Sequence, residues 1–296
     1  MAKKPDIKGT RKLVKDMAIP TRPTVMLEVI KAQNTFAPDL QKVANVISRD
    51  VVLASRVLQA ANSDLPGLKR RVASIEQAVM LLGLARIRTL ITGVFLNTSL
   101  IGKGGSLQKL RHRCADVARV TAFIAQELPR LATPFQSGYL PSIPPDEAYA
   151  LGLFHDCGLS ILMQKFSDYE SFYEEIQKES PFGLVSAEDE RYHTNHCVVG
   201  YLLCESWNLP KHLCEVIRNH HHMVDFTKPG KKSANRRTMT LHGILKLAEQ
   251  ITGELSYVEW VRMKDDLFRF FNIGDSQVAQ LQEGASRLLQ TPSVTE

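Results

Sequence analysis

The chain has 296 residues, of which 44% are hydrophobic and 23% are charged. This balance is typical of a globular protein and argues against a disordered chain. No apolar run reaches the ~20 residues that span a bilayer, and the basic start at Met1–Pro5 lacks the apolar core of a secretory signal. We therefore expect a cytoplasmic protein without membrane insertion.

The net charge of +6 comes largely from two segments, Met1–Lys15 and Lys228–Arg237. Two solvated segments of this kind do not make an organised basic face, so nucleic acid is a disfavoured partner. The number of cysteines is odd and no two form a CxxC pair, which argues against a disulfide framework and a zinc knuckle. They occur in apolar helical patterns, and we expect buried packing thiols: Cys114, Cys157, Cys197, Cys204 and Cys214.

Helical periodicity dominates the N-terminal third, and the alternation typical of strands is absent. Asp39 and Asp50 are suited to cap two successive helices. Ser74–Gln77 has the form of a capping box, with serine at the cap and glutamine three residues later. The helix that follows should bend or end at Gly83. The sequence thus predicts an all-α fold.

The rest of the chain also reads as helices separated by polar or proline-rich loops. The stretch Pro129–Pro145 holds five prolines and should be an exposed loop, as should the basic stretch Lys228–Arg237. The predicted helices are Leu107–Leu128, Asp146–Phe166, Tyr169–Gln177, Ala187–Trp207, Lys211–His221, Leu241–Thr252, Tyr257–Phe271 and Asp275–Leu289.

Histidines concentrate in one part of the chain, since eight of the nine lie between His155 and His242. Asp156 follows His155 inside an apolar stretch, where an unpaired carboxylate would be strongly destabilising. A divalent metal ion would compensate this charge, and so would a basic residue from another helix.

Further ligand-type residues follow on the next predicted helices. Glu190, His193 and Cys197 share a stripe with Gly200, and His196 lies beside it. His220 continues the buried face of the helix after Lys211, and His221 is adjacent. Imidazoles and carboxylates on neighbouring helices suit a divalent transition metal. We expect His222 to be solvated and His193 and His212 to be ordinary, partly buried histidines, while His242 could be either.

These motifs occur in the order of a known family. The stretch around His155-Asp156 resembles the HD motif, and Ile217–His221 resembles a later double histidine. Together the motifs resemble the HDOD family, a bacterial signalling branch of the HD superfamily of metal-dependent phosphohydrolases, from about Pro20 to His221. The matching segments are Leu53–Ser63, Ser74–Arg88, Gly152–Leu159, Glu188–Pro210 and Ile217–His221.

The resemblance implies a multi-helix HD-like fold with two helical lobes. We divide the chain into a basic segment (1–19), an N-terminal lobe (20–101), an HD-like lobe (102–225), and a basic loop with C-terminal helices packed on the HD-like lobe (226–296). The resemblance implies a metal (Fe, Mn, Zn or Ni) and no organic cofactor. The implied ligands are His155, Asp156, His196, His220 and His221.

Two outer ligands of the catalytic relatives are altered. The register puts Arg113 where an earlier histidine is expected, with His112 one residue away, and Glu249 replaces a late aspartate. A step of one residue turns a helical side chain by about 100°. The resemblance therefore favours a catalytically silent regulatory module that binds protein partners through its N-terminal lobe.

Two alternatives stay open. A phosphodiesterase or nucleotidase would use Asp156, Glu190 and Arg113 for catalysis, with Arg113 or Lys109 holding the phosphate of a nucleotide ligand. A nucleic-acid or acidic-protein binder would use Lys69–Arg71 and Lys231–Arg237, although no nucleic-acid-binding signature accompanies them.

Overall fold

The computed structural model describes residue 10 and residues 28–29, 39–48, 51–63, 72–99, 105–131, 140–179, 183–206, 209–222, 224–227 and 233–290. Their regular structure is helical and includes no strand, so the prediction of an all-α fold is confirmed. Within these ranges no helix is both long and apolar enough to cross a membrane. Asp50, Lys69–Arg71, residues 132–139 and residues 228–232 lie outside the described residues, as does nearly all of the segment 1–19.

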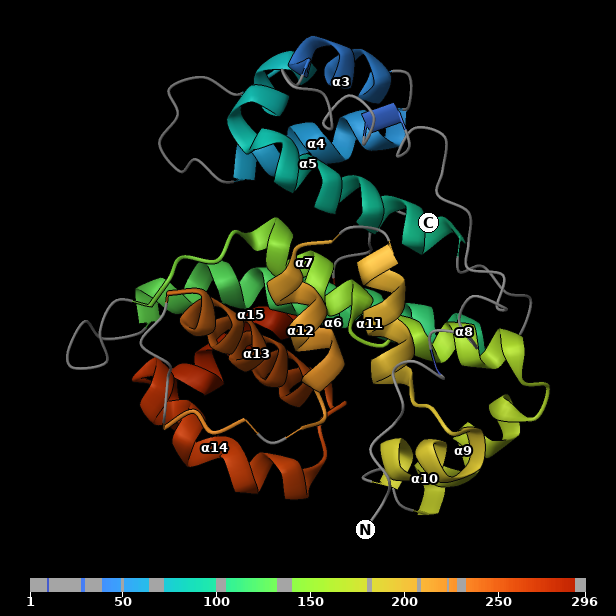
Figure 1. The fold of residues 1–296 in the computed structure, drawn as a ribbon. Helices are drawn as coiled ribbons and strands as arrows, with labels where there is room; N and C mark the ends of the chain where they lie inside the picture. Colours follow the sequence, from blue (N-terminus) through green and yellow to red (C-terminus); the bar gives the residue numbers. More distant parts are fainter. Residues whose placement is uncertain are drawn as a thin grey trace.

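Three N-terminal helices pack together in the upper part of Figure 1: α3 (Leu40–Ile47), α4 (Val51–Ser63) and α5 (Ile75–Ser99). The side chain of Asp39 accepts a hydrogen bond from the backbone N–H of Lys42, which confirms the predicted cap. Gly83 has φ 73° and ψ 161°, so α5 bends where the sequence predicted. Asn62 ties the end of α4 to the start of α5 through two hydrogen bonds with the backbone of Val72, of 2.8 and 2.9 Å.

The remaining helices form the larger, lower part of the molecule (Figure 1). The long α6 packs against α7, α13 and α15, and α11 lies against α8 and α12. Close approach of α7 to α6 depends on Gly152, because a Cβ there would lie 2.6 Å from the Cα of Ala118. The helices are α6 (Gly105–Leu131), α7 (Pro145–Phe154), α8 (Cys157–Lys165), α9 (Tyr169–Glu179), α10 (Leu184–Tyr192), α11 (His196–Ser206), α12 (Lys211–Asn219), α13 (Ser233–Thr252), α14 (Tyr257–Phe271) and α15 (Asp275–Gln290).

Three predicted boundaries were wrong. The predicted helix Asp146–Phe166 is two helices, α7 and α8, that meet at His155-Asp156. The predicted helix Ala187–Trp207 is also two helices, because α10 ends where His193 adopts a left-handed conformation (φ 58°). Apolar residues on both sides of each break pack in the same core, so the periodicity continued across the breaks. The predicted loop Lys228–Arg237 is helical from Ser233 onward.

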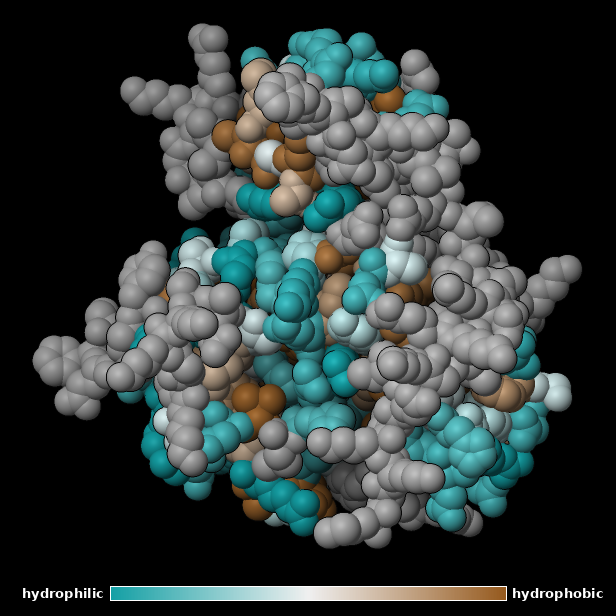
Figure 2. Space-filling view, viewed as in Figure 1, coloured by the Kyte–Doolittle hydropathy of each residue, from teal (hydrophilic) through white to brown (hydrophobic). Residues whose placement is uncertain are grey.

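Hydrophilic residues cover most of the described surface on the face drawn in Figure 2, and hydrophobic residues gather over the N-terminal helices α3–α5. Among the residues whose burial is described, the large hydrophobic side chains that are exposed lie on α5 and α14: Met80, Leu81, Tyr257, Val258 and Val261. All five cysteines are free and buried, as the sequence predicted.

Candidate metal centre

The two helix breaks bring the predicted ligand-type residues together. His155 ends α7 and Asp156 precedes α8, while His196 begins α11 and His220 ends α12. All four side chains are buried. The crossing of α8 and α11 is very close, since a Cβ on Gly158 would lie 2.0 Å from the carbonyl oxygen of His196. The chain thus places several helix ends, rather than one helix face, around a common point.

Three of the histidines are anchored through Nδ1. Nδ1 of His155 lies 2.6 Å from the carbonyl oxygen of Gly152, and Nδ1 of His220 lies 2.7 Å from the carbonyl oxygen of Ile217. Nδ1 of His196 lies 2.7 Å from Oε2 of Glu188. Carbonyl and carboxylate oxygens accept hydrogen bonds, so the Nδ1 of each ring donates and its Nε2 faces inward.

The three Nε2 atoms approach the carboxylate of Asp156. The distances are 3.4 Å from His155 to Oδ2, and 3.7 Å from His196 and 3.2 Å from His220 to Oδ1. The structure therefore brings together four of the five predicted ligand residues, and His221 joins through its ring contact with His220 at 4.2 Å between centroids.

An arginine provides the charge partner of Asp156. Nη2 of Arg113, on α6, lies 2.6 Å from Oδ2 of Asp156, and the same guanidinium contacts Tyr173 and Glu254. Burial by itself would raise the pKa of Asp156, but His155, His220 and Arg113 hold it well below its usual value. The sequence allowed either a metal ion or a basic residue from another helix as the charge partner of Asp156. The structure provides the basic residue, Arg113.

A second buried carboxylate also has its own cation. Nζ of Lys246 lies 2.6 Å from Oε2 of Glu249, and both side chains are buried on α13. Oε1 of Glu249 lies 4.0 Å from Nε2 of His155. Burial acts to raise the pKa of Glu249, whereas Lys246 and His155 lower it below its usual value. No motif in the sequence pointed to Lys246.

Some predicted site residues lie elsewhere. Glu190 is exposed, and Glu188, two residues earlier, is the buried carboxylate that holds His196. His112 and Lys109 are exposed on α6, while the next residue after His112, Arg113, reaches the site. The sequence pattern favoured Glu190 because it assumed one helix from Glu190 through Cys197, but α10 ends at Tyr192 and α11 begins at His196.

The other histidines stay outside the cluster. His222 is exposed, as predicted, but His193 is exposed as well, so the prediction of partial burial was wrong for this residue. Nε2 of His212 lies 2.7 Å from Glu147. His242 is buried against Phe226, and its Nε2 has no hydrogen-bond partner among the residues that the structure describes.

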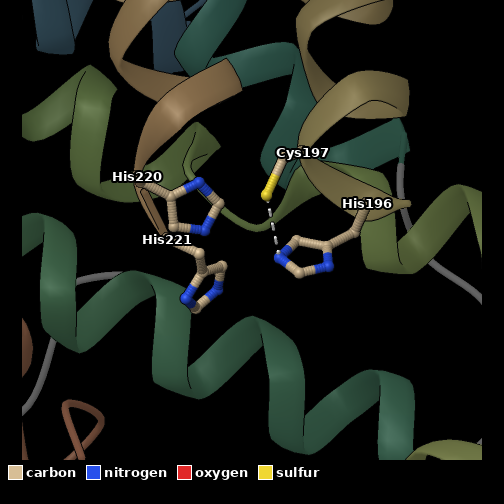
Figure 3. Close-up of side chains that lie close together, drawn as sticks. All are labelled: His196, Cys197, His220 and His221. Atoms are coloured by element: carbon tan, nitrogen blue, oxygen red, sulfur yellow. Dashed lines mark hydrogen bonds between the residues drawn. The ribbon is translucent and has the colours of Figure 1, made fainter. Parts of the chain in front are cut away.

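Cys197, which was predicted to be a buried packing thiol, lies inside the cluster. His196, Cys197, His220 and His221 each offer one donor atom, and these four atoms lie within 4.8 Å of one another (Figure 3). Sγ of Cys197 is 3.5 Å from Nε2 of His196. Its place on the stripe with Glu190 and His193, next to His196, was the signal of this role in the sequence.

The thiol of Cys197 and the neighbouring imidazoles change one another's pKa values. Burial acts to raise the pKa of Cys197, but the neighbouring His196 and His220 lower it to about 7. Burial acts to lower the pKa of His220, but Cys197 and Asp156 raise it to about 10. The pKa of His196 is likewise raised, by Cys197 and Glu188, against the effect of burial. His196 and His220 thus favour the thiolate form of Cys197, whereas burial and these two rings lower the pKa of His221 well below its usual value.

Residues 19–223 match the HDOD domain family. The chain belongs to this family. A curated relative, an uncharacterised protein of Treponema pallidum, is 27% identical over 276 residues, which are 91% of this chain and 49% of the relative. The HDOD chain therefore spans about half the length of the curated relative that it matches.

Solved structures share the fold. A Shewanella amazonensis protein named a candidate phosphohydrolase has a TM-score of 0.59 at 22% identity, with 94% of this chain and 93% of that chain covered. An HDOD domain protein of unknown function from Geobacter sulfurreducens has a TM-score of 0.53 at 22% identity, covering 96% and 99%. A Marinobacter aquaeolei protein named a candidate signal transduction protein has a TM-score of 0.53 at 18% identity, covering 97% and 66%.

His155 and Asp156, here called the HD pair, do not fit the metal that the HD superfamily implies. A divalent ion on Oδ2 of Asp156 would have to displace Arg113, and one on Oε2 of Glu249 would have to displace Lys246. Both displaced side chains would remain as buried or half-buried cations beside the ion, which is electrostatically unfavourable. Within the described residues, the nitrogen and sulfur donors of His196, Cys197 and His220 are not paired with a lysine or an arginine.

Proposed function

We propose that this chain is a bacterial, cytoplasmic signal-transduction protein of the HDOD family whose HD pair does not hydrolyse phosphate esters. The observation that carries this proposal is the ion pair between Arg113 and Asp156, at 2.6 Å. In a metal-dependent phosphohydrolase, the metal polarises the phosphoryl group and lowers the pKa of a bound water. An arginine neutralises the carboxylate without supplying a coordination site for that water.

The pairing of Lys246 with Glu249 supports the same conclusion. A metal-dependent hydrolase would use the carboxylates of Asp156 and Glu249 to bind its metal ion. In this chain each of them is already paired with a cationic side chain, Arg113 or Lys246. The fold would then be kept for regulation. We propose that the N-terminal lobe, residues 20–101, is the platform for protein partners, and the name of the Marinobacter relative fits a role in signalling.

The second candidate function is a metal-dependent phosphohydrolase. The inward-facing Nε2 atoms of His155, His196 and His220 favour it, as does the name of the Shewanella relative. In such an enzyme Asp156 would be the central acidic group and Arg113 could bind the phosphate of a nucleotide. Glu188, rather than the exposed Glu190, would orient His196.

A hydrolysis assay on the full chain separates the two functions. The protein is incubated in turn with Mn²⁺, Fe²⁺, Zn²⁺ and Ni²⁺ and offered cyclic dinucleotides, cyclic mononucleotides, nucleotides and p-nitrophenyl phosphate esters. We expect turnover no greater than that of Asp156→Asn prepared in parallel. Steady turnover by the wild-type chain that disappears in Asp156→Asn would establish the phosphohydrolase and overturn the proposal.

A further inference from the structure

We propose that the chain binds one thiophilic transition-metal ion, of the zinc class, through His196 Nε2, Cys197 Sγ, His220 Nε2 and a ring nitrogen of His221. This site adjoins Asp156 and uses three of the histidines in the implied ligand set, but it replaces His155 and Asp156 by the thiolate of Cys197. It goes beyond the proposed function, because metal binding here does not depend on whether phosphate esters are hydrolysed.

The distances among the donors are close to those of a tetrahedral site. With Zn–S of about 2.3 Å and Zn–N of about 2.0–2.1 Å, tetrahedral angles place sulfur and nitrogen about 3.6 Å apart. Sγ of Cys197 and Nε2 of His196 are 3.5 Å apart. The widest separation among the four donor atoms is within 4.8 Å, so small side-chain rotations close the rest. His221 is half-buried and is the member best placed to rotate.

The hydrogen bonds behind the rings prepare the donors. Glu188 holds His196 by Nδ1 at 2.7 Å, and the carbonyl of Ile217 holds His220 by Nδ1 at 2.7 Å. A carboxylate or carbonyl behind a histidine is the usual arrangement around a bound metal, because it fixes the tautomer and leaves the other nitrogen as the donor. Figure 3 shows His196 and Cys197 on one helix and His220 and His221 at the end of another, facing a common space.

The charge balance favours this position over the HD pair. Arg113 and Lys246 already neutralise Asp156 and Glu249. At the cluster, a thiolate and neutral rings would bind the ion, and the protons carried by His196 and His220 would be released to solvent. Oδ1 of Asp156, at 3.2 Å from His220 and 3.7 Å from His196, adds negative charge beside the ion while Oδ2 stays with Arg113.

The thiolate determines the class of metal. Sulfur and imidazole donors favour Zn²⁺ and its spectroscopic substitute Co²⁺, whereas Mn²⁺ and Mg²⁺ prefer oxygen donors. The other buried cysteines are not part of the cluster. The sulfur atoms of Cys157 and Cys204 lie 4.0 Å apart, and neither residue belongs to the group of four donors.

The test is a Co²⁺ titration of the chelator-treated, untagged full chain, followed by visible and near-ultraviolet absorption. We expect one equivalent of Co²⁺ to give tetrahedral d–d bands with a thiolate-to-cobalt charge-transfer band, and Zn²⁺ but not Mn²⁺ to displace it. Cys197→Ser should remove the charge-transfer band and weaken binding at least about tenfold. Cys204→Ser is the matched control, a buried thiol on the same helix, and should keep the band.

The Asp156→Asn variant distinguishes this site from the HD pair. It should keep the charge-transfer band, since Asp156 supplies charge but is not a ligand. Three results would overturn the proposal: no Co²⁺ binding by the folded wild-type chain, bound Co²⁺ without a thiolate band, or a metal that stays in Cys197→Ser and leaves in Asp156→Asn. If Cys197→Ser does not fold, the wild-type spectrum and Cys197→Ala decide the outcome by the same criteria.

Discussion

Nη2 of Arg113 lies 2.6 Å from Oδ2 of Asp156, which ties the N-terminal third of α6 to the junction between α7 and α8. The aspartate side chain is 10% exposed and the arginine 20%. A buried carboxylate with a direct guanidinium partner is already compensated, and this pair explains how the chain keeps an HD motif without needing a metal ion there.

Arg113→Met should lower the free energy of unfolding by about 2–4 kcal/mol, because it leaves Asp156 buried without its direct cation. Urea unfolding at pH 7 measures the loss. Arg130→Met is the control on the same helix, since Arg130 is 60% exposed in its ion pair with Glu127, and it should cost less than about 0.5 kcal/mol. Mn²⁺ should restore stability to Arg113→Met and leave the wild type unchanged. Equal losses in both variants would contradict the role of Arg113.

Glu188→Gln should weaken Co²⁺ binding about 10–100-fold and keep the thiolate band, because Glu188 orients His196 without touching the metal. Glu190→Gln should change neither, because Glu190 is exposed two residues further along α10. Titration of both variants by absorption makes the comparison. An effect of Glu190→Gln as large as that of Glu188→Gln would show that the position of the carboxylate does not matter.

Gly158→Ala should lower the free energy of unfolding by about 2–4 kcal/mol. The added Cβ would lie 2.0 Å from the carbonyl oxygen of His196 and 2.9 Å from the backbone nitrogen of Gly200, so α8 and α11 must separate. Gly93→Ala on α5 is the control, since its Cβ would meet only Leu153 at 3.8 Å, and it should stabilise by about 0.5–1 kcal/mol. Thermal and urea unfolding report both, and an unchanged Gly158→Ala would refute the close crossing.

Glu147 should make the stability depend on pH in the acid range. Burial acts to raise its pKa, but hydrogen bonds from His212 and Arg237 lower the pKa below its usual value. A carboxylate with a lower pKa in the folded state stabilises the fold above its unfolded pKa of about 4.3, and this contribution disappears as the pH falls through the folded pKa.

Glu147→Gln should therefore be less stable than the wild type by about 1–3 kcal/mol at pH 7, and the difference should narrow below about pH 4. Urea unfolding at several pH values measures it. Glu283→Gln, which removes an exposed partner of Arg287, should show no comparable difference. A difference in the free energy of unfolding between the two proteins that grows as the pH falls would contradict a lowered pKa of Glu147.

Much of the fold followed from periodicity. The helix predicted at Leu107–Leu128 is the core of α6, and the bend at Gly83 and the cap at Asp39 were also predicted correctly. The two helix breaks were not predicted, because hydrophobic spacing reports which residues are buried and not where the backbone turns. His193 leaves the helix through a left-handed conformation that no apolar pattern marks.

The same limit applies to the site. The spacing of the histidines and the order of the motifs singled out His155, Asp156, His196, His220 and His221, and the structure brings them together. Their partners were harder to identify. On α6, His112 and Arg113 differ by one residue and about 100° of rotation, and only the packing of α6 decides which side chain faces Asp156.

The sequence by itself determined that this protein is helical, that it has the motifs of the HDOD family, and that ligand-type residues gather in its second half. The tertiary structure decided which groups those residues meet: Arg113 beside Asp156, Glu188 behind His196, and Cys197 among the histidines. The physical reason is that burial leaves a periodic signal along one helix, whereas the charge and hydrogen-bond partners of a buried group come from other helices whose rotation is set by packing alone.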